Sequence, residues 1–150
     1  MGLESRFDFV GINRKLIEAQ VAVSNAIIEN LMILGEECLN EVRNNGSYMD
    51  DTGSLRSSTG YFVVRDGDIV DYGGFKKIKQ GGDGVEAGKA LIDELIDNYN
   101  SGYALIVVAG MEYAAAVESK GFNVLTSGEI LAKTKIVQVL RRVKNAIKRR

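Results

Sequence analysis

The stretch GYFVVRDGDIVDYG, residues 60–73, decides the fold class of this chain. Two short runs rich in β-branched and aromatic residues, 60–65 and 69–73, flank the pair Asp66-Gly67. An Asp-Gly pair between two such runs is typical of a tight β-hairpin. The sequence therefore predicts two antiparallel strands, within a unit of turn and hairpin that spans residues 46–75.

The residues before this unit are predicted to form one long helix, assigned to 1–45. Apolar residues between Gly11 and Asn44 recur at steps of three, four and seven, and a second apolar row widens the stripe. About 30 helical residues span about 45 Å at 1.5 Å per residue. Gly46 supplies a left-handed stop. An apolar face of this length is expected to bury against more than its own domain.

The residues after the hairpin predict a loop, a helix and a strand. Residues 76–84 are basic and then glycine-rich, and we expect a flexible, exposed loop there. Helical spacing returns over 85–99. The run Tyr103–Ala109 is almost continuously apolar and has the length of a strand, so it is predicted to be the central buried strand of the sheet.

A short helix is expected over 111–119 and a short strand over 122–125, which completes the segment 85–125. Thr126 with Glu129 three residues later has the pattern of a capping box, so the last helix is expected to occupy 126–150. Residues 1–150 thus predict a single α+β domain. It combines a long N-terminal helix, a small antiparallel or mixed sheet with a hairpin, and two further helices.

Composition narrows the classes of function. The 150 residues contain no histidine and one cysteine, Cys38, which excludes Ser-His-Asp and Cys-His centres, an internal disulfide and a thiolate zinc cage. No apolar run approaches the roughly 18 residues of a membrane helix, and no charged-then-apolar leader opens the chain. A reducing cytoplasm is a compatible place of synthesis, and we expect neither a metal nor a cofactor.

The net charge of −1 hides an uneven distribution. No acidic residue follows Glu129, whereas the last helix is basic. Its candidate interface residues are Lys133, Lys135, Arg141, Arg142, Lys144 and Lys148. Such a helix is expected to face a neighbouring protein or the phosphates of DNA. A basic last turn also simply complements the helix dipole.

The triplet Asp51-Thr52-Gly53 occurs in aspartic proteases, where it ends an apolar strand and a symmetric partner shares the proton. Here the preceding residues are polar and follow a helix, and the downstream Gly110-Met111-Glu112 lacks the arginine of the second protease element. The preferred interpretation is structural. Asp51 or Thr52 caps a turn or short helix, Gly53 allows the bend, and Leu55 packs inward.

Three weaker patterns favour structural roles. The glycine-rich stretch 81–90 lacks the Ser or Thr of a phosphate loop and places Asp83 inside the cradle. Cys38 lies on the apolar stripe of the first helix and is expected to pack there. The acid pairs Glu36-Glu37 and Asp50-Asp51 are expected to be solvated rather than to hold a cation.

Two elements together resemble a known family. The stretch DDTGSLRSS, residues 50–58, resembles the Asp-Thr-Gly-x-Leu-x-x-Ser element of neck and tail-completion proteins of tailed bacteriophages, the minor tail components of long-tailed siphophages and their prophages. In that family it also follows a long N-terminal helix. The second element, Tyr-Ala-x-Tyr-Val-Glu-x-Gly, is similar to YAAAVESKG, residues 113–121. This stretch departs from it at Ala116, where Tyr is usual, and by one extra residue before Gly121.

The resemblance implies a non-enzymatic structural virion protein, a subunit of a head–tail connector ring that joins the capsid portal to the tail and leaves a channel for DNA. The implied partners are further copies of the chain, portal-side connector proteins, and tail tube or terminator proteins, with a passing contact to genomic DNA and no membrane. The implied location is the neck or tail region of the virion, after synthesis in a bacterial cytoplasm. The alternative is a small cytoplasmic adaptor or nucleic-acid-binding module that uses the basic C-terminal helix.

The matched residues are expected to be architectural, forming turns and core contacts. They are Asp51, Thr52, Gly53, Leu55, Arg56, Ser58, Tyr113, Ala114, Val117, Glu118 and Gly121.

Overall fold

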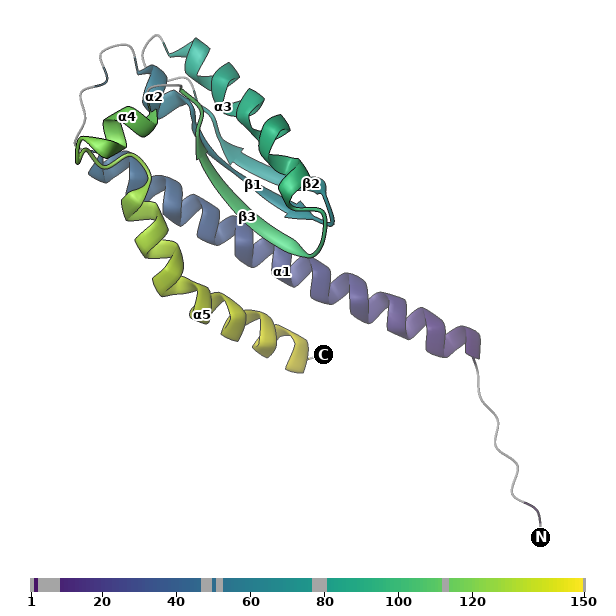
Figure 1. Cartoon of the computed structure of the whole chain (residues 1–150). Helices are drawn as coiled ribbons and strands as arrows, with labels where there is room; N and C mark the ends of the chain where they lie inside the picture. Colours follow the sequence, from purple (N-terminus) through teal and green to yellow (C-terminus); the bar gives the residue numbers. More distant parts are fainter. Residues whose placement is uncertain are drawn as a thin grey trace.

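The computed structural model describes residues 2, 9–46, 50, 53–76, 81–111 and 114–149, with the side chains of Phe9 and Ala116 excepted. Its elements are α1 (Phe9–Asn45), α2 (Ser54–Ser57), β1 (Thr59–Arg65), β2 (Asp68–Gly74), α3 (Gly82–Leu95), the 3-10 turn η1 (Ile96–Asn98), β3 (Tyr103–Ala109), α4 (Ala114–Ser119) and α5 (Thr126–Lys148). The fold is mixed α+β, as predicted. Helix α3 covers one face of a small sheet, and α1 and α5 lie on the other side (Figure 1).

The sheet has the strand order β2-β1-β3, and both pairings are antiparallel. The prediction that Tyr103–Ala109 is the central strand is wrong, since β3 lies at an edge. Strand β1 is central because it is hydrogen-bonded on both sides, and its residues from Thr59 to Val64 are all buried. The longer apolar run of β3 reflects packing on both of its faces rather than a central place in the sheet.

The predicted hairpin is confirmed. Arg65 is opposite Asp68, and the two turn residues Asp66 and Gly67 have φ values of 50° and 86°. Positive φ at both positions is the geometry that Asp-Gly turns favour between twisted strands. The Asp66 carboxylate also accepts a hydrogen bond of 2.7 Å from the backbone N–H of Gly102, which ties the turn to the start of β3.

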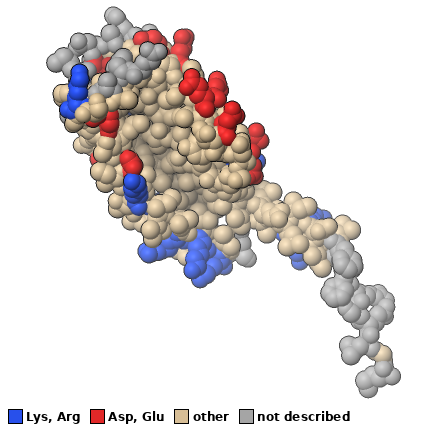
Figure 2. All heavy atoms as spheres, in the orientation of Figure 1, with Lys and Arg blue, Asp and Glu red and all other residues tan. Residues whose placement is uncertain are grey.

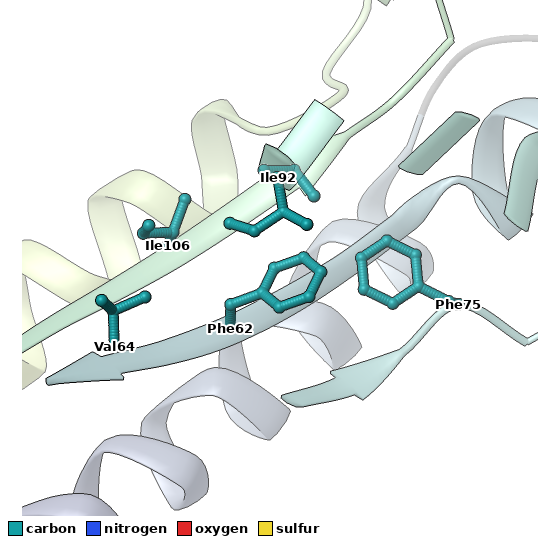
Figure 3. Packing of buried hydrophobic residues seen from close by; sticks show 6 residues of the cluster. Phe62, Val64, Phe75, Ile92 and Ile106 are labelled. Atoms are coloured by element: carbon teal, nitrogen blue, oxygen red, sulfur yellow. The ribbon is translucent and has the colours of Figure 1, made fainter. Parts of the chain in front are cut away.

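Alternate residues of the sheet pack into two separate apolar layers. Phe62 and Val64 of β1 and Ile106 and Val108 of β3 face α3, where they surround Ile92 (Figure 3). Their cluster also contains Phe75, whose ring centroid lies 5.2 Å from that of Phe62.

The prediction that residues 76–84 form a flexible, exposed loop is wrong for the end of this segment. Phe75 is buried in the core, and α3 begins at Gly82. Glycines at the start of α3 lower its helix propensity, but tertiary packing against α2 overrides that preference. Residues 77–80 lie outside the described part of the chain.

The opposite face of the sheet packs on α1. Tyr61 and Val63 of β1 meet Leu31 and Leu39 of α1. Helix α5 then packs beside this half of α1, where Val139 meets Leu34 and Cys38. Cys38 is fully buried, and burial raises the pKa of its thiol, so its predicted packing role is confirmed.

The predicted long helix is confirmed, but its two halves differ in surroundings. From Leu31 to Val42 the inward face is buried by the sheet and α5, whereas residues 12–21 are all exposed. The N-terminal half extends beyond the rest of the molecule as an arm (Figure 1). We call residues 10–21 the α1 arm.

Helix α1 also contains an 18-residue window with a mean hydropathy of 1.3. This corrects the expectation that no stretch of the chain has the length and apolarity of a membrane helix. By length and composition alone, α1 passes that test within the described residues. One such helix is weak evidence for a membrane, because the core helix of a soluble protein passes the same test.

Candidate interaction surfaces and the motif junction

The two motif elements meet at one end of the sheet. Leu55 of α2 shares a buried cluster with Ala114, and Val117 of α4 packs against that cluster. Val124, just before α5, is buried in the same place. We call this region the motif junction. The predicted inward packing of Leu55 is confirmed, while Asp51, Thr52 and Tyr113 lie outside the described residues.

A carboxylate organises the first motif element, and that carboxylate belongs to Asp50. Its two oxygens accept hydrogen bonds from the backbone N–H groups of Leu55 (3.3 Å) and Arg56 (2.9 Å). Gly53 precedes α2 with φ at 77°, a left-handed conformation that disfavours side chains, so its predicted bend is confirmed. The hydroxyl of Ser58 donates to the carbonyl of Leu55 at 2.7 Å. The expectation that Asp50 is solvated is therefore wrong, because its side chain is buried and bonded to the start of α2.

Glu118 organises the second motif element. Its carboxylate accepts hydrogen bonds from the backbone N–H groups of Leu125 (3.1 Å) and Thr126 (3.0 Å), and also from that of Val124 and from the Thr126 hydroxyl. The last turn of α4 is thereby joined to the first turn of α5. A negative charge at a helix N-terminus is favourable, because unpaired N–H groups point toward it.

Two sequence predictions near this helix start are wrong. Residues 122–125 form no strand, since the N–H groups of Val124 and Leu125 bond to the Glu118 carboxylate instead of a β-ladder. Glu129 makes no capping box and instead accepts a hydrogen bond of 2.6 Å from Lys133. The N–H of Ser127 is satisfied by the side chain of Asn123 at 3.0 Å. Gly121 ends the α4 turn with φ at 86°, as expected.

The glycine-rich stretch serves close helix packing. A Cβ at Gly84 would lie 1.9 Å from the carbonyl oxygen of Ser54, and one at Gly88 would lie 2.4 Å from that of Ser58. The hydroxyl of Ser54 donates to Asp83 at 2.7 Å, and this bond lowers the pKa of the Asp83 carboxyl. These contacts account for the glycines without a phosphate.

The basic helix has two kinds of cation. Lys133 bonds to Glu129, and Lys135 bonds to Glu37 of α1 at 3.0 Å, so both have partners within the chain. The others are exposed and have no ion-pair partner among the described residues: Arg141, Arg142, Lys144 and Lys148. These four residues are the part of the predicted interface that is available to another molecule.

Large apolar side chains are exposed on the α1 arm. They are Val10, Ile12, Leu16, Ile17 and Val21, and Val10 is 80% exposed. Side chains of this kind scattered singly need no explanation, but here they follow one another on a helix that leaves the body of the molecule. The rest of the described chain therefore leaves the apolar surface of this half of α1 uncovered, and its predicted burial against another molecule stays a prediction.

Within the described residues, no group of three or more Cys, Asp or Glu side chains is arranged to hold a metal ion. No protein-family model matches the chain. Comparison with curated proteins and with solved structures likewise gave no match.

Proposed function

We propose that the chain is a non-enzymatic structural subunit of a tailed-phage virion, in a head–tail connector ring between portal and tail. The proposal rests first on the resemblance of residues 50–58 and 113–121 to neck and tail-completion proteins. Such a ring leaves a central channel for DNA, and its subunits contact one another as well as portal-side and tail proteins.

The α1 arm is the observation that carries the proposal. An exposed apolar helix costs free energy in water at roughly 25 cal/mol per Å² of apolar surface that a partner would otherwise cover. A monomer working alone gains nothing from an arm of this kind. A subunit that packs against other subunits can bury this apolar surface in the contact.

The junction supports an architectural role for the motif residues. Leu55, Ala114 and Val117 contribute apolar packing, and Glu118 contributes hydrogen bonds to the start of α5. Side chains engaged in this way set the angle between helices, which is the kind of role that the resemblance implies.

The second candidate is an adaptor or nucleic-acid-binding module, favoured by the exposed cations of α5. Binding to DNA phosphates predicts an affinity that falls steeply with salt. However, Val137, Leu140 and Ile147 are exposed among those cations. Apolar side chains suit a protein surface better than a phosphate backbone, so we place this function second.

The test is deletion of the gene in the phage or prophage that encodes the chain, followed by electron microscopy of the lysate. We expect filled capsids and separate tails, with joined particles restored by the gene supplied in trans. Normal infectious particles from the deletion strain would contradict the proposal. Under the second candidate, particles stay normal and the purified protein binds duplex DNA.

A further inference from the structure

The outward face of α3 is acidic. Gly84, Gly88 and Ile92 are buried against α2 and the sheet, which turns the other side of the helix to solvent. The exposed residues there follow a helical spacing: Asp83, Glu86, Ala90, Asp93 and, in η1, Asp97. Glu94 lies beside them and Lys89 is the one cation of α3. We call Glu86, Asp93, Glu94 and Asp97 the acidic face.

The outward face of α5 is basic and partly apolar. Val139 and Val143 are buried against the rest of the protein. Positions on the opposite side of the helix carry both exposed cations and exposed apolar residues. We call this set the basic face: Val137, Leu140, Arg141, Lys144 and Lys148.

These two faces lie on opposite sides of the molecule. The layers run from α3 through the sheet to α1 with α5, so the acidic and basic faces point away from each other. Figure 2 shows the separation, with carboxylates gathered along the α3 edge and cations gathered over the end of α5. Neither face can neutralise the other within one chain.

The faces also match in length. From residue 86 to 97 the acidic face covers about 16 Å, and from residue 137 to 148 the basic face covers about the same length, at 1.5 Å per residue. A contact between unlike patches of identical chains is heterologous, and repetition of such a contact closes into a ring when the rotation allows.

We propose that the basic face of α5 in one copy docks on the acidic face of α3 in the next copy. This inference rests on the proposed function, because it names the faces through which the ring subunits meet. Charge complementarity selects the partner face and excludes α3-to-α3 and α5-to-α5 contacts, since like charges repel. Val137 and Leu140 contribute apolar burial that a partner made of phosphates does not offer.

The test uses two triple variants of the full chain. One reverses the basic face (Arg141→Glu, Lys144→Glu, Lys148→Glu) and the other reverses the acidic face (Glu86→Lys, Asp93→Lys, Asp97→Lys). All six residues are exposed, so both variants should keep the wild-type circular dichroism spectrum. Asp68→Lys with Lys120→Glu is the control, because these exposed residues belong to neither face.

Sedimentation velocity gives the expected pattern. Wild type and control self-associate, and each triple variant alone associates at least about tenfold more weakly. An equimolar mixture of the two triple variants assembles again, since each face then meets an opposite charge. The chain with all six substitutions also assembles, but it does not incorporate wild-type chains.

Three results would overturn the inference: a wild type that stays monomeric at every concentration, an acidic-face variant that assembles like wild type, or a mixture that stays monomeric. Loss of duplex DNA binding on reversal of the basic face, with assembly unchanged, would assign that face to nucleic acid and overturn it too. If the wild type assembles and neither charge reversal weakens that assembly, the contact between α5 and α3 is refuted, while the proposed function is not. The proposed function fails separately, if the deletion strain makes normal particles.

Discussion

At the scale of single residues, Glu118 joins two helices through one carboxylate. Glu118→Ala leaves the N–H groups of Val124, Leu125 and Thr126 without this acceptor. Losing a helix cap and hydrogen bonds to a charged group together costs about 2 kcal/mol of unfolding free energy. We expect urea denaturation to show a decrease of this size in the free energy of unfolding.

The matched control is Glu129→Ala. Glu129 is also a carboxylate near the start of α5, but its carboxylate forms an ion pair with the exposed Lys133 instead of capping the helix. An exposed pair of this type contributes little to stability, so the midpoint of unfolding should stay close to that of wild type. Equal losses in the two variants would show that Glu118 acts as a surface charge and not as a cap.

Tyr61 predicts the behaviour of the protein at alkaline pH. Burial, and then the hydrogen bond of 3.0 Å from its hydroxyl to Glu36, raise its pKa from 10.0 to about 12. Below pH 10 both folded and unfolded states keep the proton. Between pH 10 and 12 the unfolded state releases it while the folded state does not, so stability is lost as the pH rises, by up to about 2–3 kcal/mol.

Tyr61→Phe should therefore flatten the fall in unfolding free energy between pH 10 and 12, although the variant loses one hydrogen bond at neutral pH. Urea titrations at a series of pH values measure this slope. Tyr72→Phe removes an exposed tyrosine from the neighbouring strand and should keep the wild-type slope. A wild-type slope in the Tyr61 variant would refute the assignment.

At the scale of elements, α3 shows a conflict between helix propensity and packing. In an open helix, Gly→Ala stabilises by about 1 kcal/mol. At Gly88 the new Cβ would lie 2.4 Å from the carbonyl oxygen of Ser58 and 2.5 Å from the Phe75 ring. Gly88→Ala should instead destabilise by about 1–3 kcal/mol through overpacking.

Thermal unfolding followed by circular dichroism checks the sign of the change at Gly88. Lys89→Ala, at the next and exposed position of the same helix, controls for helix propensity and should be close to neutral. A higher melting temperature for Gly88→Ala would mean that α3 does not pack closely on α2 and β1.

The elements also show how far sequence alone leads. Periodicity and turn chemistry predict α1, the hairpin and α5, because these depend on local spacing and on Asp66-Gly67. The start of α3 was missed since its glycines suggest a loop, and only contacts with Ser54 and Ser58 explain them. The place of β3 was missed because an apolar run indicates burial and says nothing about which strand has two neighbours.

The candidate surfaces divide in the same way. The cations of α5 can be recognised in the sequence as a stretch without acidic residues. The acidic face of α3 was missed because only the apolar positions of this helix were used to predict it. The packing partners of Leu55 lie far from it in the sequence, so no local pattern predicts them. The capping by Glu118 reaches only as far as Thr126, but it depends on how the turn after α4 folds back toward α5. The 3.6-residue spacing of Glu86, Asp93 and Asp97 was the available signal.

At the scale of the whole molecule, we expect the α1 arm to affect self-association and the rest of the chain to determine the stability of the fold. The body is held by Leu31, Leu34, Leu39 and Val42 of α1, which lie well beyond the arm. Residues 12–21 are exposed, so they contribute little burial to the folded chain. Deletion of residues 1–18 should therefore leave cooperative unfolding and a melting temperature within a few degrees of wild type.

Self-association should respond differently to the same deletion. The arm offers Ile12, Leu16 and Ile17 to a neighbouring molecule, so its removal should weaken assembly in sedimentation velocity while the monomer stays folded. Leu16→Glu with Ile17→Glu is the point-variant counterpart, because it keeps the helix length and removes only apolar surface. Glu18→Gln, on the same exposed segment, is the control and should assemble as wild type does. If the truncated chain assembles normally, the arm is not a contact between subunits. If the truncated chain unfolds, the arm is needed for the stability of the single chain.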